Sequence, residues 1–322
     1  MFQHTTQQAQ VIFMLDRFSD ATKGALLLVS GISIFGFSDN LTLLVSDDVS
    51  VGQFHFSRSV IAMGMVIVAA RLFGMRVIPK LWKPIAARTI FMVTSMLLYF
   101  GAMPMMPIAE AGAGLFTSPI FVLLFSAVLF GERIGVRRIL AVVVGTAGVW
   151  CVLQPGADGL SIYQFMPILA GACYAIGSII TFRYLQDESA FAILFSFLTA
   201  IGISGAVITS AFTFFPASET LVATAPFLFS AWQDVDTQYW IYLFIIALGA
   251  TTALSLMTRA YQLAQTSYAA IFEYAYLLSV SYFSWLFWDT APNSIGVIGI
   301  ILIIASGVII TLAQRSAHKA ST

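Results

Sequence analysis

The chain has 322 residues, of which 59% are hydrophobic and 9% are charged. A soluble domain carries about 25% charged residues, so this composition predicts an integral membrane protein and excludes an ordinary soluble enzyme. The formal net charge is zero, so the charge balance gives no sign of a nucleic acid partner.

The first 22 residues carry no recognisable secretory signal. No basic region precedes the short apolar run 11–15, and Asp16, Arg17 and Asp20 interrupt the apolar pattern there. We expect residues 1–22 to form a cytoplasmic segment, either a short surface helix or a disordered tail.

Ten apolar stretches follow, each near the length of about 20 residues that crosses a bilayer. They predict an all-α membrane protein with ten transmembrane helices. A tight turn with Pro104 and Pro107 joins the third and fourth, and the longest connection is 215–238. The stretches are 23–45, 52–72, 87–105, 107–130, 135–153, 161–183, 190–214, 239–259, 267–288 and 293–314.

The chain contains an internal repeat. Residues 87–132 align without gaps on residues 244–289, which lie 157 positions later (244 − 87 = 157). The predicted helix–helix turn and the predicted helix end coincide in the two copies. Each half would hold five spans, and an odd number forces the second copy to run in the opposite direction through the membrane.

The repeat predicts the domain organisation. A first five-helix repeat would occupy residues 23–153, and a second, inverted five-helix repeat would occupy residues 161–314. Residues 315–322 would form a cytoplasmic tail.

The distribution of basic residues predicts the orientation, because Lys and Arg are enriched in cytoplasmic loops. With both termini cytoplasmic, Arg58 alone falls in the outer half. The other fourteen basic residues fall at the inner face: Arg17, Lys23, Arg71, Arg76, Lys80, Lys83, Arg88, Arg133, Arg137, Arg138, Arg183, Arg259, Arg315 and Lys319.

Several runs resemble the drug/metabolite transporter superfamily, in its ten-span EamA-type branch. In the first half they are Pro-Ile-Phe-Val at 119–122, Leu-Phe-Gly-Glu-Arg at 129–133 and Gly-Thr-Ala-Gly-Val at 145–149. In the second half they are Ala-Cys-Tyr-Ala at 172–175, Arg-Ala-Tyr-Gln-Leu-Ala at 259–264 and Phe-Glu-Tyr at 272–274.

The resemblance extends from about residue 23 to residue 314. The second copy departs from it at 288–290, where Trp-Asp-Thr replaces the usual Gly-Glu. It implies a carrier of small organic metabolites, such as amino acids, nucleotide-related compounds or vitamins, without naming the ligand.

Glu273 is the sharpest candidate for a functional residue, because ionisable groups inside the hydrocarbon are costly. It lies six residues into its predicted span and shares a helix face with Tyr276. Its repeat equivalent is Phe116, so the fold itself does not require an acid there. Glu273 is expected to bind a solute or a proton, and the alternative is a structural ion pair with Arg259 or Arg183.

Asp39 and Arg58 lie at equal depth, about six residues from the outer ends of the first two spans. An ion pair between them would hold the two helices together, or the two charges would bind a zwitterion. Asn40, beside Asp39, would add an amide contact.

Aromatic and small polar residues are candidates for the wall of a cavity. They are Tyr99 and Phe100 in the third span and Tyr174 in the sixth, where Tyr174 shares a face with Ser178. Such a stripe lines either water or a closely packed neighbouring helix.

No pattern indicates a metal, a cofactor or a catalytic site. Cys151 and Cys173 fall inside apolar spans and are expected to be free thiols, and His4, His55 and His318 have no ligand spacing. The GxxxxGK[ST] motif is absent, which argues against ATP-driven transport within this chain.

The sequence therefore predicts a secondary transporter of a small organic metabolite, working by alternating access in the plasma membrane (the inner membrane if the source is bacterial). Its partners would be the solute, the lipid bilayer and a coupling proton, and it would be a monomer or a homodimer. The competing hypothesis is a membrane enzyme acting on a lipid or isoprenoid, which needs His, Asp or Glu clustered at one membrane face. The expected solute-binding residues are Glu273, Tyr276, Tyr174, Ser178, Tyr99, Phe100, Asn40, Asp39, Arg58 and Arg259.

Overall fold

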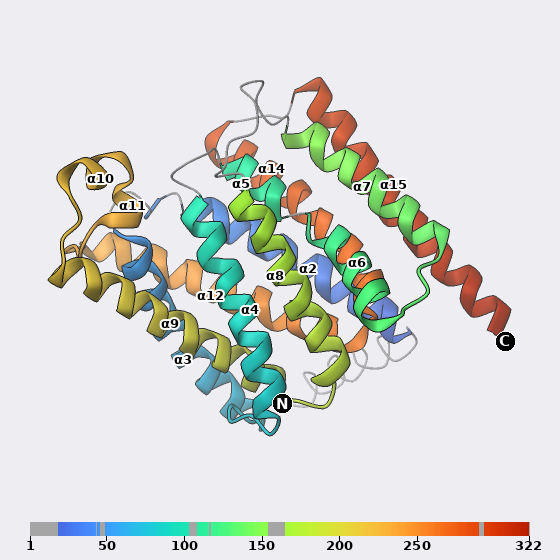
Figure 1. The fold of residues 1–322 in the computed structure, drawn as a ribbon, viewed down its shortest axis with the longest axis horizontal. Helices are drawn as coiled ribbons and strands as arrows, with labels where there is room; N and C mark the ends of the chain where they lie inside the picture. Colours follow the sequence, from blue (N-terminus) through green and yellow to red (C-terminus); the bar gives the residue numbers. More distant parts are fainter. Residues whose placement is uncertain are drawn as a thin grey trace, which may run out of the picture.

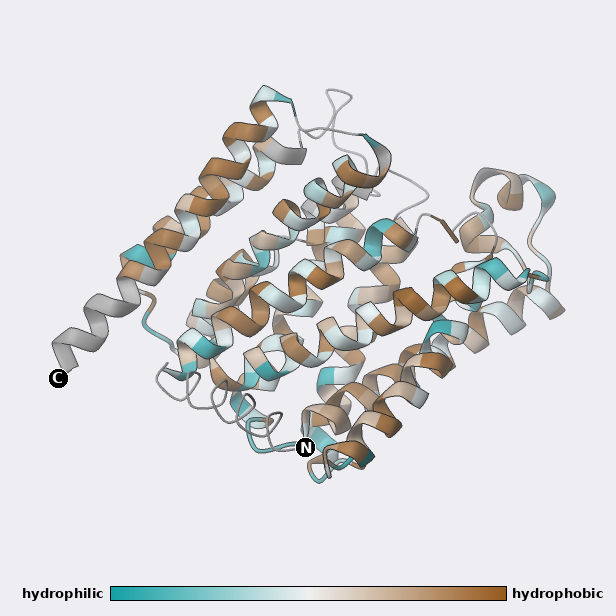
Figure 2. Cartoon of the chain, turned by 180° about the vertical axis from the view of Figure 1, so that it is seen from behind, coloured by the Kyte–Doolittle hydropathy of each residue, from teal (hydrophilic) through white to brown (hydrophobic). Residues whose placement is uncertain are grey.

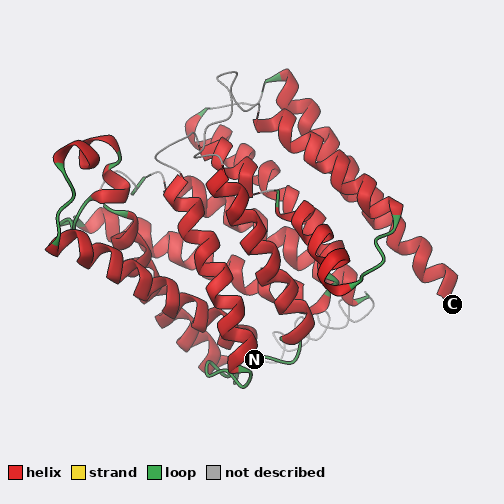
Figure 3. Cartoon of the chain, in the orientation of Figure 1, coloured by secondary structure: helices red, strands yellow, loops and turns green. Residues whose placement is uncertain are grey.

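The all-α prediction is confirmed. The computed structural model describes residues 19–42, 44–45, 49–102, 108–115, 117–153, 165–289 and 293–321, and every regular element within these ranges is a helix (Figure 3). Within the same ranges, 6 helices are long and apolar enough to cross a membrane. These six are α2 (Asp20–Thr42), α3 (Val51–Leu72), α4 (Trp82–Ala102), α8 (Phe165–Tyr184), α9 (Ala190–Phe214) and α12 (Thr237–Leu263).

The remaining helices are shorter, or lie where the sequence predicted the fourth, fifth, ninth and tenth spans. Two short helices, α10 (Glu219–Thr224) and α11 (Pro226–Phe229), occupy the long connection before α12. The others are α5 (Ile108–Leu115), α6 (Ser118–Phe130), α7 (Val136–Leu153), α13 (Thr266–Ala269), the 3₁₀ helix η3 (Ala270–Tyr274), α14 (Ala275–Trp288) and α15 (Ser294–Ser321).

The structure corrects the prediction of continuous helices over 107–130 and 267–288. The first is divided into α5 and α6, and α6 begins with a proline at its first turn, where the missing N–H costs no hydrogen bond. The second is divided into α13, η3 and α14, with a 3₁₀ segment between two α-helical pieces. Phe116, Pro104 and Pro107 lie outside the described residues.

Some predicted helix ends also differ from the structure. α4 begins at Trp82 rather than at residue 87, and α12 continues to Leu263 rather than to residue 259. α15 continues to Ser321, so most of the expected tail 315–322 is a continuation of the last helix. The N-terminal segment, apart from residues 19–22, lies outside the described residues.

Helices from the two halves of the chain pack against each other in pairs. The most extensive contacts join α2 to α12, α4 to α8, α3 to α9 and α7 to α15. Figure 1 shows α7 and α15 side by side along much of their length. The two halves therefore pack against each other through these four helix pairs, and the buried core lies between them.

Glycine allows the close approach of α3 and α9. A Cβ atom added to Gly52 would lie 2.8 Å from the carbonyl oxygen of Gly205, and one added to Gly205 would lie 2.5 Å from the carbonyl oxygen of Gly52. Small residues at such contacts are typical of helices that pack inside membranes.

The outer surface of the bundle is apolar. Figure 2 shows hydrophobic residues along the whole length of the long helices. Large side chains such as Val128, Trp150 and Ile203 are exposed there. Such a surface suits contact with lipid, in agreement with an integral membrane protein.

Candidate solute-binding site

The two interrupted segments meet at Glu273. This residue lies in η3 and is 2% exposed. Its Oε2 atom accepts a hydrogen bond of 2.7 Å from the hydroxyl of Ser118, the first residue of α6, and its Oε1 atom accepts one from Tyr261 of α12. The broken helices thus bring an acid and its donors together inside the bundle.

Tyr174 and Ser178 of α8 lie beside this acid. The hydroxyl of Tyr174 faces the Glu273 carboxyl group, and its ring meets the ring of Tyr261 edge-on, with centroids 6.4 Å apart. Ser178 lies next to both tyrosines. We call Glu273, Tyr174, Ser178, Tyr261 and Ser118 the Glu273 cluster. The small polar stripe that the sequence predicted on α8 therefore faces the acid.

A second group of buried polar residues surrounds Asp39 of α2. The Oδ2 atom of Asp39 accepts a hydrogen bond of 2.5 Å from the hydroxyl of Tyr276, on α14. Tyr99 of α4 lies beside both groups. Because Tyr276 is three residues after Glu273, the two groups are neighbours along the same segment of chain.

Arg58 is buried on α3, with neighbours that the sequence did not indicate. It is 5% exposed, and one guanidinium nitrogen lies 3.3 Å from Nδ1 of His55. The guanidinium also lies 4.9 Å from the ring centroid of Phe54 and 5.8 Å from that of Phe100, distances at which aromatic rings attract a cation.

The ion pair expected between Asp39 and Arg58 is absent from the salt bridges of the described residues. Each charge instead has closer polar or aromatic partners of its own. The two residues remain near enough for their charges to interact.

Two of the predicted binding residues have other surroundings. The Asn40 amide donates to the carbonyl oxygens of Gly36 and Val280, so it ties α2 to α14. Arg259 is exposed and donates to Gln262, away from the Glu273 cluster, because α12 turns its side chain outward there.

The alternative explanation of Glu273 as half of an ion pair gains no support in the described part of the chain. Neither Arg259 nor Arg183 forms a salt bridge with it. Arg183 lies 4.1 Å from the ring centroid of Phe130 and 4.0 Å from a carboxylate oxygen of Glu132.

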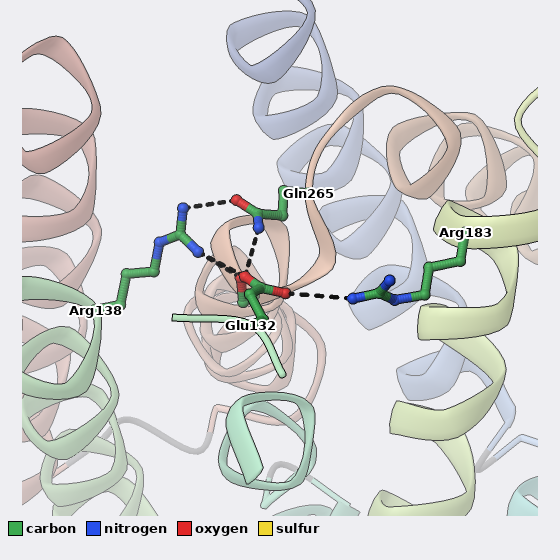
Figure 4. Close-up of polar contacts among 5 residues, drawn as sticks. Glu132, Arg138, Arg183 and Gln265 are labelled. Atoms are coloured by element: carbon green, nitrogen blue, oxygen red, sulfur yellow. Dashed lines mark hydrogen bonds and ion pairs between the residues drawn. The ribbon is translucent and has the colours of Figure 1, made fainter. Parts of the chain in front are cut away.

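Glu132 holds together one end of the bundle, where α3, α6, α8 and α12 finish; we call it the basic end. Its carboxylate accepts hydrogen bonds from Arg138 at 2.9 Å, from Gln265 at 2.5 Å and from Ser267 at 2.6 Å. Figure 4 shows Glu132 between Arg138 and Gln265 on one side and Arg183 on the other. These residues, the Glu132 cluster, join the two halves of the chain.

A second set of contacts joins the halves at the same end. The carboxylate of Glu188, between α8 and α9, accepts hydrogen bonds from the backbone nitrogens of Lys80 and Leu81, at 2.7 and 2.8 Å. The amide of Gln262 donates to the carbonyl oxygens of Leu185 and Glu188. Charge-assisted and buried hydrogen bonds of this kind fasten the basic end.

Sequence reasoning missed Ser118, Tyr261 and His55 as members of these groups. Ser118 stands directly before Pro119, and a serine beside a helix-breaking proline marks a helix start with its hydroxyl at the break. Tyr261 carried no signal of its own, because its contact with Glu273 depends on which helices pack together. His55 lies three residues before Arg58 on α3, a spacing that places both side chains on one helix face. Among the described residues, no group of three or more His, Cys, Asp or Glu side chains is arranged to hold a metal ion.

Comparison with known proteins agrees with this architecture. Residues 22–154 match the EamA-like transporter family. The chain is 25% identical to the pseudopaline exporter CntI of Pseudomonas aeruginosa over 91% of this chain and 97% of that protein. It is 28% identical to a riboflavin transporter of Brucella anthropi over 60% of this chain and 63% of that protein.

Two further matches are a curated uptake transporter and a solved structure. An S-adenosylmethionine uptake transporter of Rickettsia bellii is 22% identical over 71% of this chain and 74% of that protein. A crystal structure with 18% sequence identity superposes with a TM-score of 0.75, covering 92% of this chain and 99% of that one, which establishes likeness of fold alone. The predicted resemblance to the drug/metabolite transporters of the EamA type is confirmed, since residues 22–154 of this integral membrane protein match the EamA-like transporter family and the relatives are named as transporters or exporters.

Proposed function

We propose that this chain is a secondary transporter that moves a small organic metabolite across the membrane by alternating access. The hydrogen bond between Ser118 and Glu273 carries this proposal, because it joins two interrupted apolar segments at corresponding positions of the two halves. In secondary transporters, interrupted helices at equivalent positions commonly form the solute site near the middle of the membrane.

The proposed architecture is ten spans in two inverted repeats, residues 23–153 and 161–314. The helix pairs support it. In the proposed repeats, α8 is the equivalent of α2, and α12 is the equivalent of α4. Exchanging the halves therefore converts the pair α2–α12 into the pair α8–α4, and it leaves the pairs α3–α9 and α7–α15 unchanged. A contact pattern that survives this exchange is expected of a two-fold repeat.

The closed basic end supports alternating access. Among the described residues, the Glu132 cluster and the contacts of Glu188 join the halves at the basic end. A solute that leaves toward the basic end requires these bonds to open. Breaking a few charge-assisted hydrogen bonds costs a few kcal/mol, which a bound solute or proton is able to supply.

The relatives support a transporter over the competing enzyme hypothesis, because their names describe export, transport and uptake of small molecules. Those names cover three different solutes, so they support a class of function and no single substrate. Glu273 supplies a carboxyl group for a solute cation or for a coupling proton.

We further propose that the basic end faces the cytoplasm, which leaves both termini on the cytoplasmic side. Fourteen of the 15 Lys and Arg residues fall on that side of the predicted spans, as the positive-inside rule requires.

Counterflow into proteoliposomes tests the function. Purified protein is reconstituted into vesicles preloaded with one unlabelled compound, and the same labelled compound is added outside without ATP. The panel comprises the 20 common amino acids, riboflavin and S-adenosylmethionine. We expect at least one compound to accumulate transiently above its level in protein-free vesicles. If the whole panel matches the protein-free control, the proposal fails for these solute classes.

A further inference from the structure

Arg88 is a buried cation that forms no salt bridge within the described part of the chain. It lies on α4 and is 7% exposed. Its Nε atom donates a hydrogen bond of 2.9 Å to the hydroxyl of Thr181, and one of its terminal nitrogens is buried and makes no hydrogen bond.

The helix contact around Arg88 is tight. A Cβ atom added to Gly177 of α8 would lie 2.8 Å from the end of the Met92 side chain, so α4 and α8 touch one turn from Arg88. This contact holds the guanidinium against the polar face of α8, where Tyr174, Ser178 and Thr181 lie at successive turns of the helix. The position of Arg88 is thus fixed by packing, and the side chain has little freedom to reach the surface.

An unpaired guanidinium in the interior of a membrane protein is unfavourable by several kcal/mol. Interior charges of this kind usually find a counter-ion in the protein or in a ligand. Because the described chain gives Arg88 no carboxylate, we expect its partner to be an anion that binds reversibly. A transported solute is such a partner.

A second buried polar group lies on the same face. The Ser178 hydroxyl is fully buried and makes no well-formed hydrogen bond, although it lies beside Tyr174. Tyr174 is also within electrostatic reach of both Arg88 and Glu273. The guanidinium of Arg88, the hydroxyl of Ser178 and the carboxyl group of Glu273 therefore all lie near Tyr174.

We propose that Arg88, assisted by Ser178, binds the anionic group of the solute while Glu273 binds its cationic group. The site then selects small zwitterions, compounds that carry an ammonium and a carboxylate a few bonds apart, as amino acids do. This proposal rests on the proposed function and names the substrate class of the same site. When the zwitterion is bound, Arg88 and Glu273 each have a partner of opposite charge. This explains why the two side chains are buried without forming an ion pair with each other.

Thermal unfolding of the purified protein with matched ligands tests the proposal. The probes are the 20 common amino acids and their carboxamides, which keep the ammonium and lose the negative charge. We expect at least one amino acid to raise the unfolding temperature of the wild type, and its carboxamide to bind at least about tenfold more weakly, the effect of losing one charge-assisted contact.

Variants assign the effect to Arg88. Arg88→Gln should lose about tenfold in affinity for the amino acid and bind the carboxamide as the wild type does. Arg88→Lys should keep part of the preference for the carboxylate, because it keeps the charge. Lys83→Gln is the matched control, since it removes an exposed cation from the same end of α4 and should bind as the wild type does.

The possible results separate this proposal from the general function. Equal binding of an amino acid and its carboxamide, unchanged affinity in Arg88→Gln, or no stabilisation by any amino acid would each overturn the anion site. Counterflow of riboflavin in the same preparation would then leave the transporter function standing. If Arg88→Gln does not fold, Arg88→Lys together with the carboxamide comparison on the wild type decides the matter.

Discussion

Ser118 and Glu273 are 155 residues apart in the sequence, and a hydrogen bond of 2.7 Å joins their side chains. Ser118 begins the second part of one interrupted segment, and Glu273 lies in the 3₁₀ part of the other. A buried acid at the meeting point of two broken helices is the feature on which the proposed transport site depends.

The close contact of α3 and α9 predicts a sensitive glycine. Gly52→Val should lower the free energy of unfolding by about 1–3 kcal/mol, because the added side chain would press on Thr209 and on the backbone of Gly205. Gly64→Val on the same helix is the control, since nothing lies within 4 Å of a Cβ atom there. Denaturant or thermal unfolding of both variants checks this, and equal losses would contradict the packing.

The environment of Asp39 predicts coupling to Tyr276. Removing either hydrogen-bonding group, by Asp39→Ala or Tyr276→Phe, should cost about 1–3 kcal/mol of stability, and the double variant should cost less than the sum. Tyr282→Phe, at an exposed tyrosine of the same helix, should be neutral. A double-mutant cycle measures the coupling.

The same cycle applied to Asp39 and Arg58 should give a smaller coupling energy, because their charges interact without a direct ion pair. A larger coupling energy with Arg58 than with Tyr276 would show that Asp39 interacts more strongly with Arg58. That result would contradict the structure, in which the hydrogen bond of Asp39 is with Tyr276.

The sequence predicted the helical class, which is confirmed, because apolar periodicity is a local signal. It also drew attention to Glu273, Asp39 and Tyr276, whose side chains lie in buried polar groups, while their role in transport and the inverted repeat stay predictions. It missed the breaks inside 107–130 and 267–288. An apolar run looks the same whether its helix is continuous or interrupted, and Pro119 was the one local sign of a break in the first segment. The partners of Glu273 come from other helices, so composition and spacing could not identify them, whereas Arg58 has Phe54 and His55 of its own helix as neighbours.

Arg88 illustrates the same limit. By its position near the start of a span, the sequence assigned it to the inner surface with the other basic residues. Its burial follows from the packing of α4 against α8 at Gly177 and Met92, which no local pattern reveals.

The Glu132 cluster predicts a conformational effect at the basic end. Glu132→Gln removes the charge that Arg138 and Arg183 share, and it should shift the population toward a state open at that end by about tenfold, since a charge-assisted hydrogen bond contributes about 1.5–3 kcal/mol. The measurement is the rate at which an impermeant maleimide labels Ala269→Cys in inside-out vesicles, with both native cysteines replaced.

Glu219→Gln is the control for this labelling experiment, because it removes an acid from α10, in the connection that precedes α12. It should leave the rate unchanged. An unchanged rate in Glu132→Gln as well would mean that the Glu132 cluster does not restrain the basic end.

The proposed orientation predicts which loops face outward. A cysteine at Asp236, just before α12, should react with an impermeant reagent on intact cells, whereas one at Lys80, between α3 and α4, should not. Reversed labelling would place the basic end outside and overturn the topology.

The most direct test of the central claim is counterflow by Glu273→Gln in proteoliposomes, using the solute that the wild type accumulates. Glutamine keeps the shape and still hydrogen-bonds Ser118 and Tyr261, accepting from one hydroxyl and donating to the other, but it loses the charge and the titratable proton. We predict a folded protein with wild-type thermal stability to within about 1 kcal/mol, and counterflow reduced by at least about tenfold. If Glu273 carries only the coupling proton, exchange should persist while uptake loses its dependence on pH. Wild-type counterflow together with wild-type pH dependence of uptake in this variant would contradict the assignment of Glu273 to the transport site.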